Sequence, residues 1–430
     1  MNLVFAAIVL AAVSTAAVRQ IGWAPAEGQL SPMEALSKSM VDSAAGSVEL
    51  ALGLVGVMTL FLGLMKVAEA GGLLTVIARL IRPLMTRLFP DVPAEHPAMG
   101  AMILNLSANA LGLGNAATPF GIRAMQELNR LNPHPGTATD AMALFLAVNT
   151  SSVTLLPTGV IALRAAAGSA DPAGILPTTL FATACSTFAA IAAAKLLGRL
   201  ARRAAMPQAA AVPAEPAPVS AAESGSPDVS RGYPLWVSLL ALTFVLALIP
   251  LTVAYGRAIS PWIMPGLMAG FLIYGLCRRV PVYESFVDGA REGFQVAVKI
   301  IPYLVAILVA VGMLRASGAL DALVGALDPW TSRAGLPAAA LPMALLRPLS
   351  GSGAFAMLAS VINDPAIGPD SYAGYLFSTL QGCTETTFYV LAVYFGAVQV
   401  RRIRYALAAG LVADAAGIAA AIVACSYVRP

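Results

Sequence analysis

Leu235-Trp-Val-Ser-Leu-Leu-Ala-Leu-Thr-Phe-Val-Leu-Ala-Leu-Ile-Pro-Leu-Thr-Val-Ala254 carries no charged side chain. A helix of about 20 such residues can cross a hydrocarbon core of roughly 30 Å. Similar apolar stretches occur before and after it, at Leu3–Val18, Val48–Met65, Ile175–Ala194, Pro261–Cys277, Phe294–Leu314 and Tyr405–Ala424. The first could be a signal peptide, but it has no basic region ahead of it, so we expect a retained helix. The pattern predicts an all-α polytopic membrane protein.

The composition of the 430 residues supports this prediction. Only 11% are charged and the mean hydropathy is +0.79, whereas soluble domains carry roughly 25% charged residues. The four cysteines, Cys185, Cys277, Cys383 and Cys425, stand apart and suggest neither a metal site nor a disulfide framework. The net charge of +4 gives no reason to expect a nucleic-acid partner. We therefore expect no cofactor, and the lipid bilayer as a partner.

A polar segment divides the chain into two membrane halves, 1–198 and 234–430. The segment between them, 199–233, begins with arginines and continues from Pro207 to Pro227 with Ala, Pro, Glu and Ser. Such a composition cannot bury apolar area, so it predicts a flexible linker.

The two halves resemble each other weakly, at four places in the same order. Lys38–Asp42 resembles Glu284–Asp288, Gly63–Lys66 resembles Gly312–Arg315, Phe145–Ser152 resembles Phe377–Thr384, and the Ala-rich helix Thr178–Ala194 resembles Tyr405–Ala421. Any one match could be chance in an Ala/Leu-rich chain, but four in one order predict a repeat.

Arginine clusters predict how the repeats face. The closing helix of the first half ends at Arg199, Arg202 and Arg203, whereas its counterpart begins after Arg401, Arg402 and Arg404. If both clusters are cytoplasmic, the halves are inverted, as in many secondary transporters. The expected protein lies in the bacterial inner membrane with a cytoplasmic linker and about nine crossings, or fewer if the segments broken by Gly and Pro are re-entrant. Homo-oligomerisation is left open.

Polar residues cluster beside helix breakers within the apolar stretches. Backbone broken at membrane depth is tolerated only around a buried or watery cavity, so we predict one midplane site between the halves. Its expected residues are Asn105, Asn109, Asn115, Asn149, Thr150, Ser151 and Ser152 of the first half, and Arg347, Ser350, Ser352, Gln381, Thr384, Glu385 and Thr386 of the second. Hydroxyl and amide groups suit a small polar solute or a partly dehydrated cation. A purely structural role, in which Ser and Thr bond neighbouring backbone, is the alternative.

Glu385 is the sharpest single position, because a carboxylate in a membrane segment marks a functional site by default. It could bind a coupling cation, take up a proton, or pair with Arg347. Asp414 is a second such carboxylate.

These motifs also carry a family resemblance. Asn109-Ala-Leu-Gly-Leu-Gly-Asn-Ala-Ala-Thr-Pro119 and Leu146–Pro157 resemble the spore maturation protein A family, and Arg347–Ala354 and Gln381–Gly396 resemble the spore maturation protein B family. Both families are similar to the nucleoside-recognition, or gate, domain of nucleoside and ferrous iron transporters. The resemblance implies two separate proteins fused through the linker, and transport of a small polar solute.

We therefore expect a transporter-like protein that moves or binds a small polar or ionic solute, and not an enzyme. The alternative is a membrane scaffold or sensor that acts with envelope or spore-maturation partners.

Overall fold

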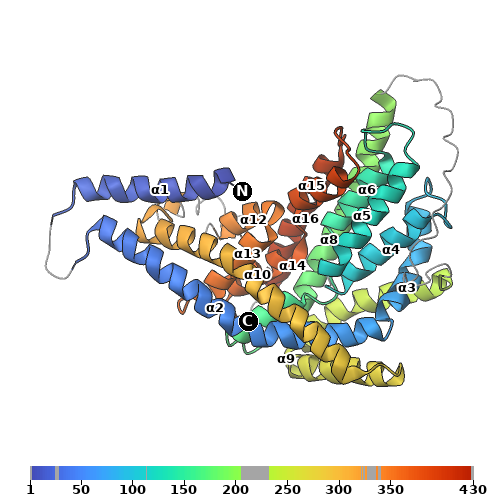
Figure 1. Cartoon of the computed structure of the whole chain (residues 1–430), viewed down its shortest axis with the longest axis horizontal. Helices are drawn as coiled ribbons and strands as arrows, with labels where there is room; N and C mark the ends of the chain where they lie inside the picture. The colour runs from blue at the N-terminus through green and yellow to red at the C-terminus, as the bar shows by residue number, and fades with distance from the viewer. Residues whose placement is uncertain are drawn as a thin grey trace.

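The computed structural model describes residues 2–24, 29–112, 114–204, 232–320, 322, 325–326, 336–337 and 340–427. Its helices are α1 (Asn2–Ile21), α2 (Pro32–Ala70), α3 (Leu73–Leu88), α4 (Pro97–Ala110), α5 (Gly114–Arg130), α6 (Asp140–Thr150), α7 (Thr158–Ala166), α8 (Leu176–Ala204), α9 (Leu235–Cys277), α10 (Val282–Ala316), α12 (Leu341–Leu349), α13 (Gly351–Ile362), α14 (Tyr372–Cys383), α15 (Thr387–Ala397) and α16 (Ala406–Tyr427). Within the described residues no strand forms, and one isolated bridge joins Thr137 to Arg402. The all-α prediction is confirmed (Figure 1).

The predicted linker falls largely outside the described residues. Helix α8 continues through Arg199 and Arg202 to Ala204, and the described chain resumes at Gly232. The first residues assigned to the linker are thus part of α8. Leu, Ala and Arg, which make up this stretch, all have high helix propensity.

Equivalent helices of the two halves pack antiparallel. In the α2/α10 pair, Gly63 meets Phe286, and its counterpart Gly312 meets Ser39 and Ser43. Phe286 aligns with Met40, which lies between Ser39 and Ser43 in the chain, so the two glycines contact equivalent regions of the opposite helix, as a two-fold relation predicts. In the α8/α16 pair, Gly198 lies against Tyr405, and Ser186 Oγ donates to the carbonyl of Ala413 over 2.8 Å. These are the contacts expected of inverted repeats.

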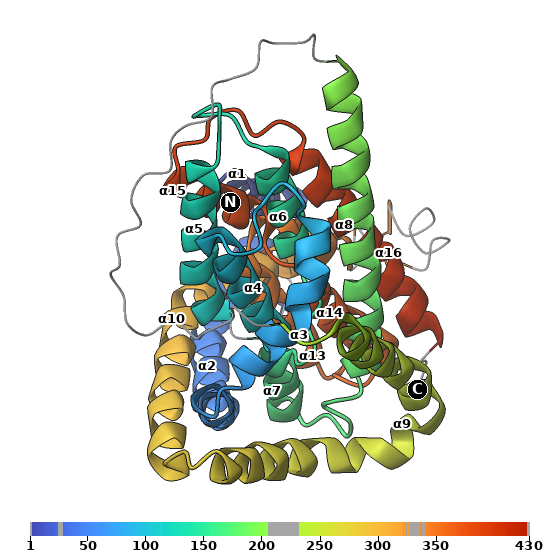
Figure 2. The same cartoon turned by 90° about the vertical axis from the view of Figure 1, so that its right-hand side faces the viewer.

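The halves are interlocked rather than side by side. One buried core combines α3 to α6 with α15 and α16, and a second combines α2 and α7 with α12 to α14. Each core therefore draws helices from both halves, and neither half has a complete core of its own. Figure 2 shows α8 and α16 lying next to each other.

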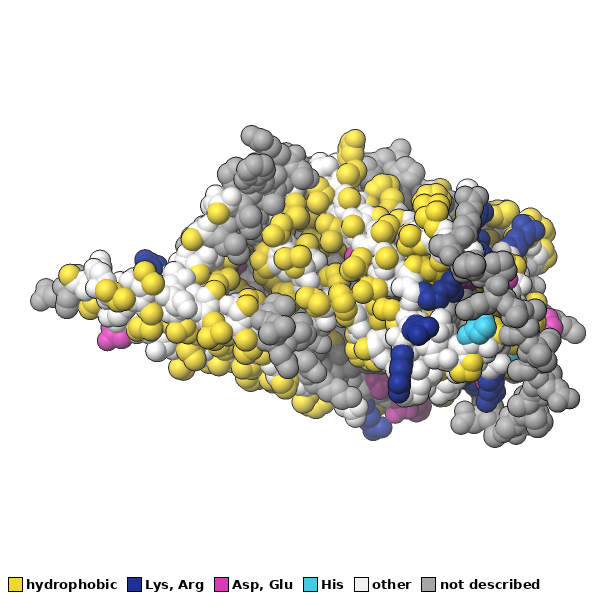
Figure 3. Space-filling model, turned by 90° about the horizontal axis from the view of Figure 1, so that it is seen from above, with side chains coloured by type: hydrophobic (Ala, Val, Ile, Leu, Met, Phe, Trp, Pro, Cys, Tyr) yellow, Lys and Arg dark blue, Asp and Glu magenta, His cyan; other side chains and the backbone are white. Residues whose placement is uncertain are grey.

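Large apolar side chains face outward, as they do in a protein surrounded by lipid. Phe188 on α8 is 76% exposed and Trp236 on α9 is 66% exposed. Figure 3 shows hydrophobic side chains over much of one face, with Lys and Arg gathered towards one end. Exposed apolar area of this extent is unfavourable in water, so the surface agrees with a membrane protein.

Fewer described helices than expected are long enough to cross a membrane unbroken. Two qualify by length and composition among the described residues, within α8 and α16, or three if Met58–Ala70 and Leu73–Leu88, bent by 68°, form one span. The other apolar stretches lie in α1, α2, α9 and α10, whereas α4 to α7 and α12 to α15 are shorter helices separated by breaks. The number of crossings stays a prediction.

The apolar stretches Leu235–Ala254 and Pro261–Cys277 both lie in the single helix α9. Figure 2 shows α9 turning along one edge of the molecule.

Candidate functional site at the crossed helix breaks

Four helix breaks lie at equivalent places in the two halves. In the first half α4 ends before Gly112 and α6 ends before Ser151; in the second, α12 ends before Ser350 and α14 ends before Thr384. Each break leaves carbonyl and N–H groups without a partner inside their helix. In a membrane these groups need partners from elsewhere in the protein.

The break after α6 crosses the break after α14. The Glu385 N–H donates to the Thr150 carbonyl over 2.7 Å, so the main chains of the two halves meet directly. Gly382 allows α14 to lie close to α8, because a Cβ there would lie 2.8 Å from Thr179. A larger residue at this position would have to displace the Thr179 side chain.

Arg347 holds the second-half break together. Its guanidinium donates to the carbonyls of Gln381, at 3.0 Å, and of Thr384, and to Thr386 Oγ1 at 3.2 Å. These groups surround the C-terminal end of α14, where a cation also complements the helix dipole. Because the guanidinium is satisfied by oxygens of the break, it does not depend on a carboxylate partner.

Glu385 is only loosely paired with Arg347. The closest oxygen lies 3.9 Å from the guanidinium, and the Glu385 side chain is 45% exposed against 7% for Arg347. Of the alternatives raised by the sequence, an essential brace for the arginine fits this geometry least. The carboxylate remains available to a solute or an ion.

A cavity of about 250 Å³ lies where the breaks meet. The second half contributes Arg347, Gly351, Gln381 and Glu385, and the first contributes Gly112, Thr154 and the start of α7. Three of the predicted site residues therefore line one cavity, formed by both halves. The predicted asparagines do not line it.

The asparagines form a separate buried centre. Asn149 Nδ2 donates to Asn105 Oδ1, and Asn105 Nδ2 donates to the Ala117 carbonyl over 2.7 Å and to the Tyr394 hydroxyl over 3.1 Å. Tyr394 belongs to α15 of the other half. These amides thus stabilise the α4–α5 break and attach α15 to it. The residues predicted to share one site therefore fall into two groups, one on the cavity and one in this buried network.

The remaining predicted residues have mixed roles. The hydroxyls of Thr150 and Ser151 donate to the Ala147 carbonyl within their own helix, and Ser350 caps α13 by accepting from the Gly353 N–H. Within the described residues, Asn109 Nδ2 and Ser152 Oγ are buried without a partner. Ser352 is partly buried, and the side chain of Asn115 lies outside the described part.

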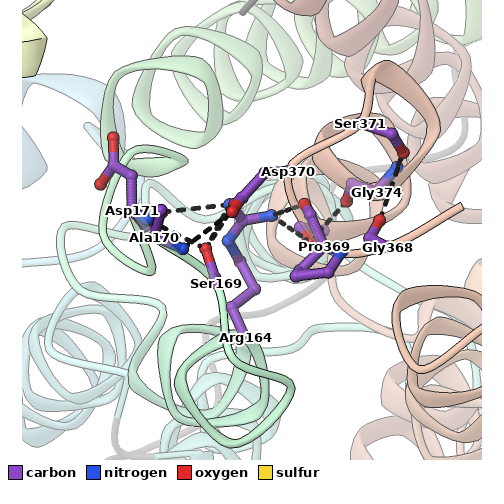
Figure 4. Close-up of polar contacts among 10 residues, drawn as sticks. Arg164, Ser169, Ala170, Asp171, Gly368, Pro369, Asp370, Ser371 and Gly374 are labelled. Atoms are coloured by element: carbon purple, nitrogen blue, oxygen red, sulfur yellow. Dashed lines mark hydrogen bonds and ion pairs between the residues drawn. The ribbon is translucent and has the colours of Figure 1, made fainter. Parts of the chain in front are cut away.

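Arg164 on α7 is a buried cation that the sequence prediction omitted (Figure 4). It donates to Asp370 at 2.9 Å, to Ser169 Oγ at 3.1 Å and to the carbonyls of Asp171 and Pro369. The side chain is 0% exposed. It joins the corner after α7 to the corner before α14, and so connects the halves. A lone arginine within the apolar run Val160–Ala167 was the available signal.

A second ion-pair cluster connects the halves at the other end of α8. Asp140 lies 2.9 Å from Arg202 and 2.8 Å from Arg404, and it accepts from the Tyr405 hydroxyl over 2.7 Å. Burial, followed by the Asp140 contact, raises the pKa of Tyr405, which keeps the phenol a neutral donor. Both arginine clusters used to predict the orientation therefore meet at one end of the molecule.

Comparison with known proteins shows which family the chain belongs to. A family model described as nucleoside recognition matches residues 51–167 and 297–401, more than half of the chain. Spore maturation protein B of Bacillus subtilis (strain 168) is 49% identical over 160 residues, which are 37% of this chain and 89% of that protein. Spore maturation protein A of the same organism is 45% identical over 159 residues, which are 37% of this chain and 81% of that protein.

No solved structure matches the chain. Two relatives that are separate proteins each match a similar share of this one, which is consistent with a fusion. The two matched segments of the family model contain all four helix breaks and the cavity between them. The chain belongs to the nucleoside-recognition (Gate) family.

Proposed function

We propose that the protein binds and moves a small polar or ionic solute at the cavity between the crossed breaks. The observation that supports this proposal most directly is the cavity itself, which is lined by residues of both halves, among them Arg347 and Glu385. Helices broken around a site at the junction of inverted repeats are typical of secondary transporters. The volume of about 250 Å³ is below the roughly 300–1,000 Å³ of drug-sized sites, so the solute is small.

The lining favours a solute with both acceptor and donor groups. The first turns of α7 and α13 border the cavity, and helix N-termini favour anions and other acceptors. Arg347 adds a positive charge on the same cavity, whereas Glu385 favours a donor or a cation. A zwitterion, an amide or a hydroxylated compound satisfies both.

Ligand-dependent stability of the purified chain tests this proposal. Amino acids, amides, polyols, nucleosides and monovalent salts are added to the detergent-solubilised protein, and the thermal midpoint is recorded. A bound solute at a hundredfold excess over its Kd stabilises by roughly 2.7 kcal/mol. Glu385→Gln should abolish that shift and leave the solute-free midpoint unchanged, because Glu385 is half-exposed and loosely paired.

Glu284→Gln, at an exposed position in the first turn of α10, is the matched control and should keep the shift. If Glu385→Gln lowers the midpoint without any solute, the residue is a brace for Arg347. If it keeps the full shift, the cavity is not the binding site.

A scaffold or sensor that acts with spore-maturation partners is the second candidate. It is favoured by the names of the two relatives, which describe a process and no solute. If deletion of the gene gives an envelope defect, cavity variants that correct the defect fully would support this role. We also propose that the protein is not an enzyme: His96 and His134, the only histidines, do not line the cavity.

We infer that the protein is a multi-pass protein of the bacterial inner membrane with its linker in the cytoplasm. The meeting of both arginine clusters at one end supports this orientation. A cysteine at Ser224, with Cys277 replaced by serine, should resist an impermeant thiol reagent in intact cells and react after lysis. Labelling in intact cells would reverse the orientation.

A further inference from the structure

Asp414 is a buried carboxylate to which the proposed solute site gives no role. It lies within α16, one of the helices able to cross a membrane, and is 2% exposed. Thr387 Oγ1, at the start of α15, donates to Asp414 Oδ2 over 2.8 Å. Within the described residues, Asp414 Oδ1 has no hydrogen-bond partner.

An ionised carboxylate with one unpaired oxygen is costly at this depth. It can be neutralised by a cation or by a proton. Protonated on Oδ2, the acid can donate to Thr387 Oγ1, since a hydroxyl also accepts. Only a neutral carbonyl oxygen then stays unpaired, which costs far less than a bare charge.

The surroundings favour the proton over a cation. Hard cations such as Ca²⁺ and Mg²⁺ take about six or more oxygen ligands, whereas Thr387 is the one side chain described as bonding to Asp414. No group of three or more His, Cys, Asp or Glu residues suited to a metal occurs in the described chain. Among the described residues, the site therefore has a hydrogen-bond partner for a protonated carboxyl group but too few oxygen ligands for a metal cation.

Small residues press this face of α16 onto the breaks of both halves. A Cβ on Gly410 would lie 2.9 Å from Thr387 and 3.7 Å from Thr150 Oγ1, and one on Gly417 would lie 3.0 Å from Thr384. A change of charge at Asp414 should therefore alter the packing of the residues that form the crossed breaks.

Arg347 connects Asp414 to the cavity. It interacts electrostatically with Asp414 and lies 3.9 Å from Glu385. The Cys383 thiol of α14 also interacts with Asp414, while α6, α8 and α15 bring the uncharged Thr150, Ser186 and Thr387 to this face. Arg347 thus interacts with two carboxylates, one in the interior and one on the cavity.

We propose that Asp414 is a reversible proton-binding site, and that its charge competes with Glu385 for Arg347. Protonation of Asp414 leaves the guanidinium to the cavity, and deprotonation draws it inward. The inference rests on the proposed function and adds its coupling ion, a proton. One proton binds to a carboxylate and the same proton is released, so no further reactant is needed.

Infrared spectroscopy of the purified full chain tests the site without any solute. The wild type at mildly acidic pH should show the carbonyl stretch of a weakly hydrogen-bonded carboxylic acid, which disappears as the pH rises. Asp414→Asn should lose this band, whereas Asp288→Asn, at an exposed position on α10, should keep it. Thr387→Val keeps the acid and removes its partner, so the band should shift but persist. Glu385→Gln should move the midpoint of the titration to lower pH, because Arg347 then interacts with Asp414 alone.

The proposal is overturned if the wild type has no acid band that depends on Asp414. It is also overturned if Na⁺ or another cation stabilises the wild type but not Asp414→Asn, since the site would then bind that cation. An unchanged midpoint in Glu385→Gln would remove the competition for Arg347. A band present in a protein that binds none of the solutes would keep the proton site and reject the solute function.

Discussion

Arg164→Met should destabilise the folded protein more than any other single change of charge in the described chain. Arg164 is fully buried and bonds to oxygens from both halves, namely Asp370 and the carbonyls of Asp171 and Pro369. Removing one partner of a fully buried ion pair costs roughly 3–5 kcal/mol, and the 38% exposure of Asp370 places the expected loss at or below the lower end of that range. Methionine fills a similar volume, so the loss reflects the acceptors left without a donor. The measurement is the thermal midpoint in detergent at a fixed heating rate.

The surface pair Arg291–Asp288 provides the control. Its side chains are 74% and 62% exposed, and an exposed pair contributes about 0–1 kcal/mol. Arg291→Met should therefore leave the midpoint nearly unchanged. Equal effects of the two substitutions would mean that the Arg164 network does not hold the halves together.

This network and the Asp140 cluster lie at opposite ends of α8. The helix begins at Leu176, shortly after Asp171, and ends at Ala204, just beyond Arg202. Its 29 residues span roughly 43 Å at 1.5 Å per residue. Both clusters join one half to the other, with the crossed breaks between them. A protein that admits a solute from alternate sides must loosen such contacts one end at a time, so the two clusters are where opening would begin.

The sequence was sufficient for the architecture but not for the interlocking of the halves. Apolar length predicts spanning helices, and paired motifs such as Gly63–Lys66 and Gly312–Arg315 predict a repeat. Neither indicates that α15 and α16 pack into the core of the first half, because an apolar helix sequence does not specify which other helix it packs against. The break positions were predictable, since Gly, Pro and Asn interrupt otherwise apolar runs.

The candidate site was predicted in part for the same reason. Arg347, Gln381 and Glu385 line the cavity, and each is polar beside a helix breaker. Asn105 and Asn149 have the same character, but they bond to each other and to Tyr394. Whether an amide lines a cavity or closes a buried network depends on which helix faces it, and this follows from tertiary packing alone. Arg164 was omitted from the predicted residues and proved to be fully buried.

Gly289→Leu should separate α2 from α10 and prevent stable assembly of the two halves. Gly289 and Gly293 form a Gly-x-x-x-Gly motif, which lets membrane helices approach closely. A Cβ on Gly289 would lie 2.5 Å from the Leu62 carbonyl oxygen and 2.5 Å from Lys66 Cβ. The carbonyl oxygen is backbone and cannot move aside without moving α2.

The expected cost is at the upper end of, or above, the roughly 1–3 kcal/mol typical of overpacking, because leucine adds a branched side chain beyond that Cβ. Gly270→Leu is the matched control, since Gly270 is a helical glycine of α9 with no atom within 4 Å of a Cβ placed there. It should keep wild-type yield and thermal midpoint, while Gly289→Leu should lower both or give no folded protein. Equal behaviour of the two variants would show that α2 and α10 do not pack through this motif, and the two-fold contact between the halves would lose its main support.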